Sequence, residues 1–293
     1  MPKETDRHPI IHGMVTGLPS MIFPSGDQMG EVFISIRNLH KNLGGKEVLC
    51  GVNLEVQKGE TLVVIGRSGC GKSVLLKHII GLMKPTEGEV IVGGRDIVQL
   101  SERHLDIMRK TIAILFQSAA LFDSMSVGEN VAFPLVEAGV KNQDEIDRRV
   151  AEALEAVDLE GEEKTMPDKL SGGMRKRVGL ARAIVSRPAC ILYDEPTTGL
   201  DPISADSINH MIRRLQKRFQ MTSIVVTHDM KCAFYVADRI ACLFDGRIYF
   251  NGTPKELQAS KDPRIHDFIT GTSEDVPITP SRVSPHSGAG LPE

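Results

Sequence analysis

The sequence predicts an α/β protein with a mostly parallel β-sheet that carries helices on both faces. Apolar runs of strand length recur along the chain, and longer segments of helical character separate several of them, as in parallel strands joined by crossover helices. One run, Thr-Leu-Val-Val-Ile at 61–65, is continuously apolar after its first residue, as a strand buried on both faces requires. The expected strands of this sheet are residues 61–65, 112–116, 190–193, 223–226 and 240–244.

Other strands and helices surround this sheet. Shorter apolar or alternating stretches at 33–36, 48–56 and 89–92 predict additional strands. Helices are expected from about 72 to 82, stopped near a proline, and from about 202 to 219.

The block from 118 to 187 reads as an all-helical insertion. Within it, Ile146, Val150, Leu154 and Val157 recur at helical spacing with charged residues opposite, which indicates one apolar stripe packed against a core.

The two ends of the chain differ from the middle. Residues 1–30 show no clear periodicity and are expected to form an extension before a domain spanning 31–262. Residues 263–293 are expected to form a helix that docks through Ile265, Phe268 and Ile269, followed by a flexible tail from 271 onward. The tail is rich in Pro, Ser and Gly and has too few apolar residues to bury a core.

Composition restricts the function classes. The 293 residues carry a formal net charge of −3, so the charge does not indicate a nucleic-acid partner. The sequence contains no run near the roughly 18 apolar residues of a membrane helix, and its first residues lack the apolar core of a signal peptide. Five cysteines without a Cys-x-x-Cys pair predict free thiols and a reducing cytoplasm.

The clearest motif lies between the expected strand at 61–65 and the following helix. It reads Gly66-Arg67-Ser68-Gly69-Cys70-Gly71-Lys72-Ser73 and satisfies the phosphate-loop pattern in full. Its glycines let backbone N–H groups turn toward phosphate oxygens, and the helix N-terminus adds partial positive charge. Lys72 is expected to reach the β- and γ-phosphates of a nucleotide, and the Ser73 hydroxyl is expected to ligate Mg²⁺.

Polar residues also follow three other expected strands. Asp194 and Glu195 end the run at 190–193, Gln117 follows 112–116, and His228 follows 223–226. Because ligands sit beyond the carboxyl ends of parallel strands, these segments should converge with the phosphate loop at one edge. We expect Asp194 to hold Mg²⁺ and Glu195 to polarise the attacking water.

Taken in order, the motifs resemble those of the ATP-binding cassette (ABC) ATPases over about residues 31–260. The match consists of the phosphate loop, Gln117, Ser171-Gly172-Gly173, Asp194-Glu195, Gly199-Leu200-Asp201 and His228. The resemblance implies a phosphate-loop NTPase with an antiparallel β subdomain, binding ATP and Mg²⁺ as a head-to-tail homodimer.

The family's arrangement also implies roles for individual residues. Ser171, Gly172 and Gly173 would bind the ATP held by the other subunit, and Asp201 would line the subunit boundary. Gln117 would contact Mg²⁺ and sense a transmembrane permease, and His228 would contact the γ-phosphate. Taken without the resemblance, Ser171 is an ordinary helix N-cap and residues 175–177 form a solvated basic face.

Two positions depart from the usual family pattern. Leu43, before Gly44-Gly45, stands where an aromatic residue usually stacks on adenine, and Met174 follows the Ser-Gly-Gly turn in place of glutamine.

Several longer strings, such as Ser-Gly-Gly-Met-Arg-Lys-Arg at 171–177 and Phe-Asp-Ser-Met-Ser-Val at 122–127, resemble a narrower branch of the family. That branch is the ATPases of Mla-type systems, which serve mammalian-cell-entry (MCE) domain proteins and move phospholipid between membranes. The resemblance implies a peripheral subunit on the cytoplasmic face of the inner membrane, with a permease and an MCE-domain protein as partners.

Three alternatives remain open at this point. The chain could serve another ABC import system, for amino acids or metals. It could be a non-transport ABC protein, although such proteins usually carry two cassettes or a long coiled coil. A phosphate-loop kinase or GTPase is the third, and it has no use for the turn at 171–173.

Overall fold

The computed structural model describes residues 30–271, so the expected extension before residue 30 and the tail beyond 271 lie outside the described residues. A six-stranded sheet forms its centre, in the order β10-β9-β3-β8-β7-β6. All neighbouring pairs are parallel except β9 and β10. The strands are β3 (Thr61–Ile65), β6 (Ile112–Leu115), β7 (Cys190–Asp194), β8 (Thr222–Thr227), β9 (Arg239–Phe244) and β10 (Arg247–Gly252).

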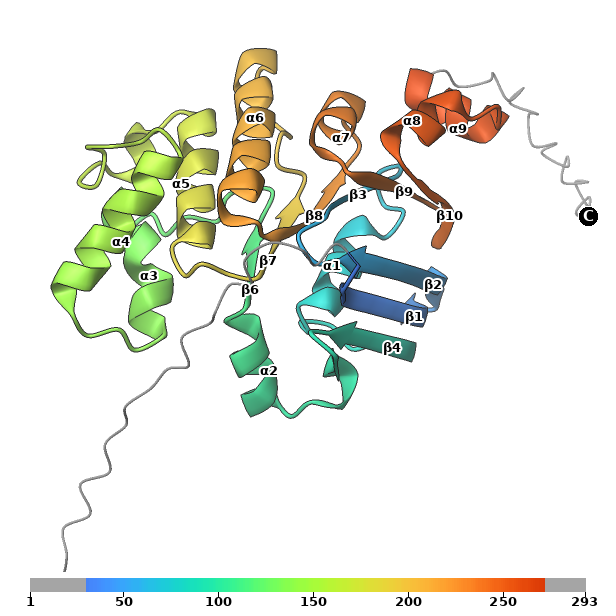
Figure 1. The fold of residues 1–293 in the computed structure, drawn as a ribbon, viewed down its shortest axis with the longest axis horizontal. Coiled ribbons are helices and arrows are strands. Elements are labelled where there is room, and N and C mark those ends of the chain that lie inside the picture. Colours follow the sequence, from blue (N-terminus) through green and yellow to red (C-terminus); the bar gives the residue numbers. More distant parts are fainter. Residues whose placement is uncertain (1–29, 272–293) are drawn as a thin grey trace, which may run out of the picture.

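A second sheet of four antiparallel strands lies beside the first (Figure 1). Its order is β2-β1-β4-β5, and glycines 44 and 45 make the turn between β1 and β2 with φ values of 59° and 87°. The strands are β1 (Val32–Leu43), β2 (Lys46–Gln57), β4 (Glu87–Val92) and β5 (Arg95–Asp96). This sheet is the antiparallel subdomain that the sequence predicted.

Helices cover both faces of the parallel sheet, as β3 illustrates. All five of its residues are fully buried. Leu62 and Val64 pack on the side of helix α1 (Lys72–Ile79), with the antiparallel sheet. Val63 and Ile65 point to the other side, toward α6 (Pro202–Phe219) and α7 (Met230–Val236). The period-two alternation of β3 therefore serves two apolar cores at once.

The predicted helical insertion is confirmed as three α-helices on one side of the molecule (Figure 1). They are α3 (Val127–Glu137), α4 (Gln143–Ala156) and α5 (Gly172–Ile184), with a 3₁₀ turn at Pro167–Lys169. The predicted stripe on α4 is buried, with its four members no more than 5 % exposed.

The carboxyl-terminal helices are α8 (Pro254–Ala259) and α9 (Pro263–Thr270). Helix α9 packs on the parallel-sheet core through buried Ile265 and through Phe268, whose ring centroid lies 5.3 Å from that of Phe244. All five cysteines are free; three are buried, and Cys50 and Cys70 are half-buried. No helix among residues 30–271 has the length and apolar character needed to cross a membrane.

Several elements differ from the sequence prediction. Helix α1 ends at Ile79, earlier than expected, because Gly81 adopts φ 71° and the N–H of Leu82 turns back to the carbonyl of Lys77. Sequence analysis missed α2 (Glu102–Arg109), α7, α8, β5 and β10, and a further 3₁₀ turn at Ile97–Gln99. These elements are short, and most have mixed polarity, so they lack the long periodic pattern on which prediction depends.

Candidate active site

The phosphate loop joins β3 to α1, as its sequence context predicted. A Cβ atom on Gly66 would lie 2.5 Å from the carbonyl oxygen of Leu243, and Gly71 adopts φ 107°, so both positions require glycine. The Lys72 side chain is only 6 % exposed, and its ammonium donates to the carbonyl of Gly66 at 2.8 Å. The buried Lys72 ammonium therefore lies near the N-terminus of α1, where partial positive charge also favours an anion.

Ser73 and Asp194 form a direct contact between α1 and the end of β7. The Ser73 hydroxyl donates to Oδ1 of Asp194 at 2.9 Å. Burial raises the pKa of Asp194, the bond from Ser73 opposes that rise, and the neighbouring charge of Glu195 adds to it. A carboxylate in this setting is stabilised by a nearby cation, and a hydroxyl and a carboxylate oxygen are ligands that Mg²⁺ accepts.

Glu195 is the most constrained residue of the site. Its backbone has φ 50°, a left-handed conformation that costs a non-glycine residue about 1–2 kcal/mol, while its N–H donates to the carbonyl of Val226 at 2.9 Å. Three side chains surround its carboxylate: His228 Nδ1 at 2.9 Å, the Thr198 hydroxyl at 3.2 Å and the Lys72 ammonium at 3.4 Å. Such a strained backbone is typical of functional positions.

Lys72, Ser73 and Glu195 line one cavity of about 400 Å³ at the carboxyl edge of the parallel sheet. Asp194 is not part of its lining and contacts it through Ser73. The structure thus brings together Lys72, Glu195 and His228 with Gln117 and Leu43, which also line the cavity. Its full lining consists of Leu43, Val48, Ser68, Gly69, Gly71, Lys72, Ser73, Val74, Gln117, Glu195, Thr198 and His228.

Two phosphate-loop side chains face elsewhere. Arg67 and Cys70 line a separate cavity of about 130 Å³ with Arg264 and Phe268 of α9. Only part of the phosphate-loop motif therefore lines the cavity around Lys72, and Arg67 and Cys70 do not.

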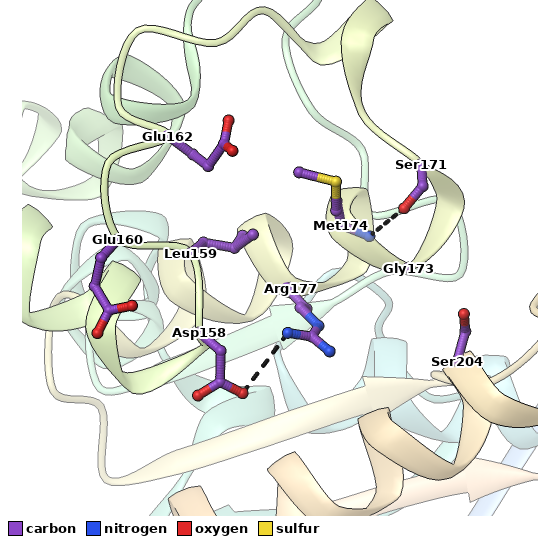
Figure 2. Close-up of a pocket in the computed structure, with 9 residues that line it drawn as sticks. All are labelled: Asp158, Leu159, Glu160, Glu162, Ser171, Gly173, Met174, Arg177 and Ser204. Atoms are coloured by element: carbon purple, nitrogen blue, oxygen red, sulfur yellow. Dashed lines mark hydrogen bonds and ion pairs between the residues drawn. The ribbon is translucent and has the colours of Figure 1, made fainter.

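The Ser171-Gly172-Gly173 turn lies at a different cavity, of about 380 Å³ (Figure 2). Ser171 caps α5, because its hydroxyl accepts from the N–H of Met174 at 3.2 Å. Glu160 and Glu162 lie on one side of this cavity and Ser204 on the other, while Asp158 and Arg177 form an ion pair at 3.6 Å between them. This cavity shares no lining residue with the one around Lys72.

Asp201 begins α6 near this second cavity. Its side chain accepts from the N–H groups of Ile203 and Ser204, each at 3.0 Å. A hydrogen bond from the Ser204 side chain, followed by those backbone bonds, holds the pKa of Asp201 below its usual value. A single chain therefore keeps Asp201 and Ser171 apart from the phosphate-loop cavity.

Lys176 corrects the expectation of a solvated basic face. It is only 5 % exposed, and its ammonium donates to the backbone carbonyl of Gln117 and, at 3.3 Å, to that of Glu195. Sequence analysis missed this role, although a signal exists: Lys176, Gly179, Leu180 and Ala183 share one helical stripe, and all four are buried. It also missed Val48, Val74 and Thr198 of the cavity lining.

Comparison with known proteins agrees with this arrangement. A family model described as ABC transporter matches residues 49–198. The ATP-binding protein of the intermembrane phospholipid transport system of Haemophilus influenzae, MlaF, is 41 % identical over 84 % of this chain and 93 % of its own length. The Fe(3+) ions import ATP-binding protein FbpC of Escherichia coli O157:H7 is 39 % identical over 86 % of this chain and 70 % of its own.

A probable ribonucleotide transport ATP-binding protein of Mycobacterium leprae is 40 % identical over 82 % of this chain and 69 % of its own. Among solved structures, cbiO1 of Clostridium perfringens, part of an ABC transporter complex, superposes with a TM-score of 0.73 at 31 % identity, covering 79 % of this chain and 92 % of that one. A dimeric ATP-binding cassette in a post-hydrolysis state with ADP and Pi, MJ0796, gives a TM-score of 0.69 at 33 % identity over 75 % and 98 % of the two chains.

The family match over residues 49–198, the 41 % identity to an ATP-binding transport protein over 93 % of its length and the likeness to solved ATP-binding cassettes show that the chain belongs to the ABC transporter family as an ATP-hydrolysing subunit.

Proposed function

We propose that this chain hydrolyses MgATP through Glu195 to drive the movement of phospholipid by a membrane transporter. The observation that supports the catalytic assignment is the position of the Glu195 carboxylate, which lines the phosphate-loop cavity between Lys72, Thr198 and His228. Phosphoryl transfer needs positioning and charge more than covalent participation, and this carboxylate is held from three sides.

The residues present fit ATP and Mg²⁺. Lys72 and the N–H groups of the phosphate loop would bind the phosphates, with His228 near the terminal one. Mg²⁺ would be held by Ser73, Asp194 and Gln117. The Ser73–Asp194 contact at 2.9 Å and the burial of Asp194 support this assignment. The metal ion would neutralise phosphate charge; the task of Glu195 is to orient a water and accept its proton.

A test of this assignment is Glu195→Gln. The amide keeps the shape of the side chain but loses the charge that polarises water, so ATP should still bind while hydrolysis falls by on the order of 1,000-fold. ATP turnover and ATP titration measure the two properties separately. Hydrolysis within about threefold of the original protein would remove Glu195 from this role.

We further propose that two copies bind ATP between them. Ser171, Gly172, Gly173 and Asp201 would contact the nucleotide bound to the partner copy or line the boundary beside it. The separation of the two cavities supports this, because neither Ser171 nor Gly173 lines the Lys72 cavity within one chain. The related cassette with ADP and Pi is dimeric. Light scattering of the Glu195→Gln protein should therefore give a dimer with ATP and a monomer without it.

The segment after Gln117 is our candidate for permease contact. Phe122 is 41 % exposed and lies over the ring of Phe133, with a centroid distance of 4.8 Å. The side chain of buried Asn130 holds the backbone of Phe122 in place, since it accepts from the Phe122 N–H at 2.8 Å and donates to the Phe122 carbonyl at 3.0 Å. An exposed aromatic side chain on a fixed loop suits a helix of a partner protein.

Phe122→Asp tests this contact. The substitution should weaken co-purification with the permease by about tenfold or more, because it places a charge in an apolar interface, while ATP hydrolysis by the isolated protein stays normal. Tyr235→Asp is a matched control, since Tyr235 is 43 % exposed on α7. Equal permease capture by both variants would rule out this surface.

The phospholipid assignment rests on the 41 % identity to MlaF over 93 % of its length, together with the strings around the Ser-Gly-Gly turn that resemble the Mla-type branch. With a permease and an MCE-domain protein as partners, the subunit would work on the cytoplasmic face of the inner membrane. The similarity to FbpC keeps metal import as the second candidate. Mass spectrometry of the complex purified through the full chain distinguishes them: an MCE-domain subunit with phospholipid supports the proposal, and an iron-binding subunit overturns it.

A further inference from the structure

Helix α5 holds two carbonyl groups of the active site through a single buried side chain. Lys176 is 5 % exposed, and its ammonium donates to the backbone carbonyls of Gln117 and Glu195. Those residues follow β6 and β7, two neighbouring strands of the parallel sheet. One ammonium therefore joins the helical insertion to two strand ends that the chain places 78 residues apart (195 − 117).

The two segments that Lys176 contacts are both strained. Glu195 has φ 50°, and Ala119 and Ala120, just after Gln117, have φ 62° and 46°. Such non-glycine conformations persist only where the surroundings determine them. Arg182, two turns further along α5, supports the second segment by donating to the carbonyls of Ala119 and Ala120, at 2.6 and 2.8 Å. Of these two cations of α5, only Lys176 also donates to Glu195.

Within residues 30–271, the charge of Lys176 has no direct ion-pair partner, since no carboxylate oxygen there lies within 4.0 Å of its ammonium nitrogen. Backbone carbonyls provide its contacts. Burial lowers the pKa of Lys176, and the nearby charges of Asp194 and Glu195 oppose that change. A buried cation without a paired carboxylate is costly, and such groups are often functional.

We propose that Lys176 is a positioning residue for ATP hydrolysis, whose ammonium fixes the backbone of Glu195 relative to Gln117 and so aims the Glu195 carboxylate into the cavity. The inference rests on the proposed role of Glu195. Because Ser171 begins the same helix, the contact also fixes the Ser-Gly-Gly turn relative to the hydrolytic site of its own chain.

The central test compares Lys176→Met, which removes the donors but keeps the length, with Lys176→Arg, which keeps both charge and donors. Lys176→Met in the full-length protein should lower kcat by about 10- to 100-fold, since displacing a catalytic group by about 1 Å can cost on the order of 100-fold. KM and the Kd for ATP should stay within about threefold, and Lys176→Arg should recover most of the rate. Lys141→Met, at an exposed site in the same insertion, is the matched control.

A second measurement separates positioning from general weakening of the fold. In a Glu195→Gln background, Lys176→Met should change the residual single-turnover rate by less than about twofold, because the group it positions is already inactive. Lys176→Gln, which retains a donor, serves if the methionine variant does not fold, and should give an intermediate loss at an unchanged unfolding temperature.

The proposal is overturned if folded Lys176→Met hydrolyses ATP at the original rate, if its loss is equally large in the Glu195→Gln background, or if kcat and ATP affinity fall together. Near-normal hydrolysis by Glu195→Gln alone would instead overturn the proposed function, so the two failures are distinguishable.

Discussion

The cavity around Lys72 and the cavity around Ser171 differ in how much of each is formed by one chain. Around Lys72, side chains from α1, from the ends of β6, β7 and β8 and from the loop after β7 contact one another or face the same space, and Lys72 and Glu195 are largely buried. Around Ser171, the cavity is lined by a helix cap, a methionine and three acids, of which Asp158 and Glu160 are exposed and Glu162 is half-buried (Figure 2). The side chains around Lys72 are already in contact without a ligand. The cavity around Ser171 instead leaves its Ser-Gly-Gly turn open to a binding partner.

This difference shows how one nucleotide site can be built from two parts, a preformed cavity of one chain and an exposed turn of another. A preorganised cavity lowers the cost of orienting groups at the moment of reaction. An exposed helix N-terminus such as that of α5 provides partial positive charge without closing the space. If a partner copy brings its nucleotide to that turn, hydrolysis requires both cavities, whereas nucleotide binding requires chiefly the first.

The largest effect is expected from Lys72→Met, which removes the buried ammonium from the cavity around Lys72. Hydrogen bonds to charged groups contribute about 1.5–3 kcal/mol each, so losing the ammonium should weaken ATP binding on the order of 100-fold and abolish hydrolysis. Titration with a fluorescent ATP analogue measures the first effect. Lys141→Met should bind normally, and an affinity within about threefold for Lys72→Met would contradict the assignment of this cavity.

A second prediction breaks the other cavity while leaving the first intact. Ser171→Ala removes the cap of α5, and Ser126→Ala removes the matched cap of α3, whose hydroxyl accepts from Glu129 N–H at 3.3 Å. Each should cost about 1 kcal/mol of unfolding free energy and lower Tm by about 2–4 °C. Only Ser171→Ala should also slow hydrolysis, by about tenfold, at unchanged ATP affinity. Equal ATPase rates for the two variants would leave Ser171 with a structural role alone.

The smallest effect is expected at the rim of the first cavity. Leu43 is 40 % exposed and lines that cavity, where stacking on a base contributes about 1–3 kcal/mol when an aromatic residue is present. Leu43→Tyr should tighten ATP binding by about 3- to 10-fold and reduce competition by GTP. His40, on the same strand as Leu43, is not placed to cover the base, because its Nδ1 lies 2.6 Å from a carboxylate oxygen of Glu47 and it does not line the cavity. No gain in the titration would mean that another residue covers the base.

Much of the phosphate-loop site could be predicted from the sequence, because the phosphate loop, Gln117, Glu195 and His228 each come just after an apolar strand. Parallel strands end at one edge, so Gln117, Asp194 and His228 had to lie near the phosphate loop once the sheet was recognised. Local patterns also predicted α6 with the bounds that the structure has, since Asp201 caps it and Pro202 begins it.

Other features depended on residues far apart in the chain, and only the tertiary structure decided them. The sequence at 175–177 resembles a solvated basic face, yet Lys176 is buried because β6 and β7 bring the carbonyls of Gln117 and Glu195 beneath α5. The strained φ of Glu195 likewise depends on its bond to Val226 in the neighbouring strand.

By itself, the sequence determined the fold class, the phosphate loop and the family, because periodicity and short motifs are local and survive without knowledge of neighbours. The tertiary structure decided which members of each motif face the same space. It turned Arg67 and Cys70 toward α9, brought Thr198 and Lys176 to Glu195, and left Ser171 at a cavity of its own. The physical reason is that burial and charge pairing arise where surfaces pack together. Packing brings together segments that are far apart in the chain, and the local sequence does not indicate which segments these will be.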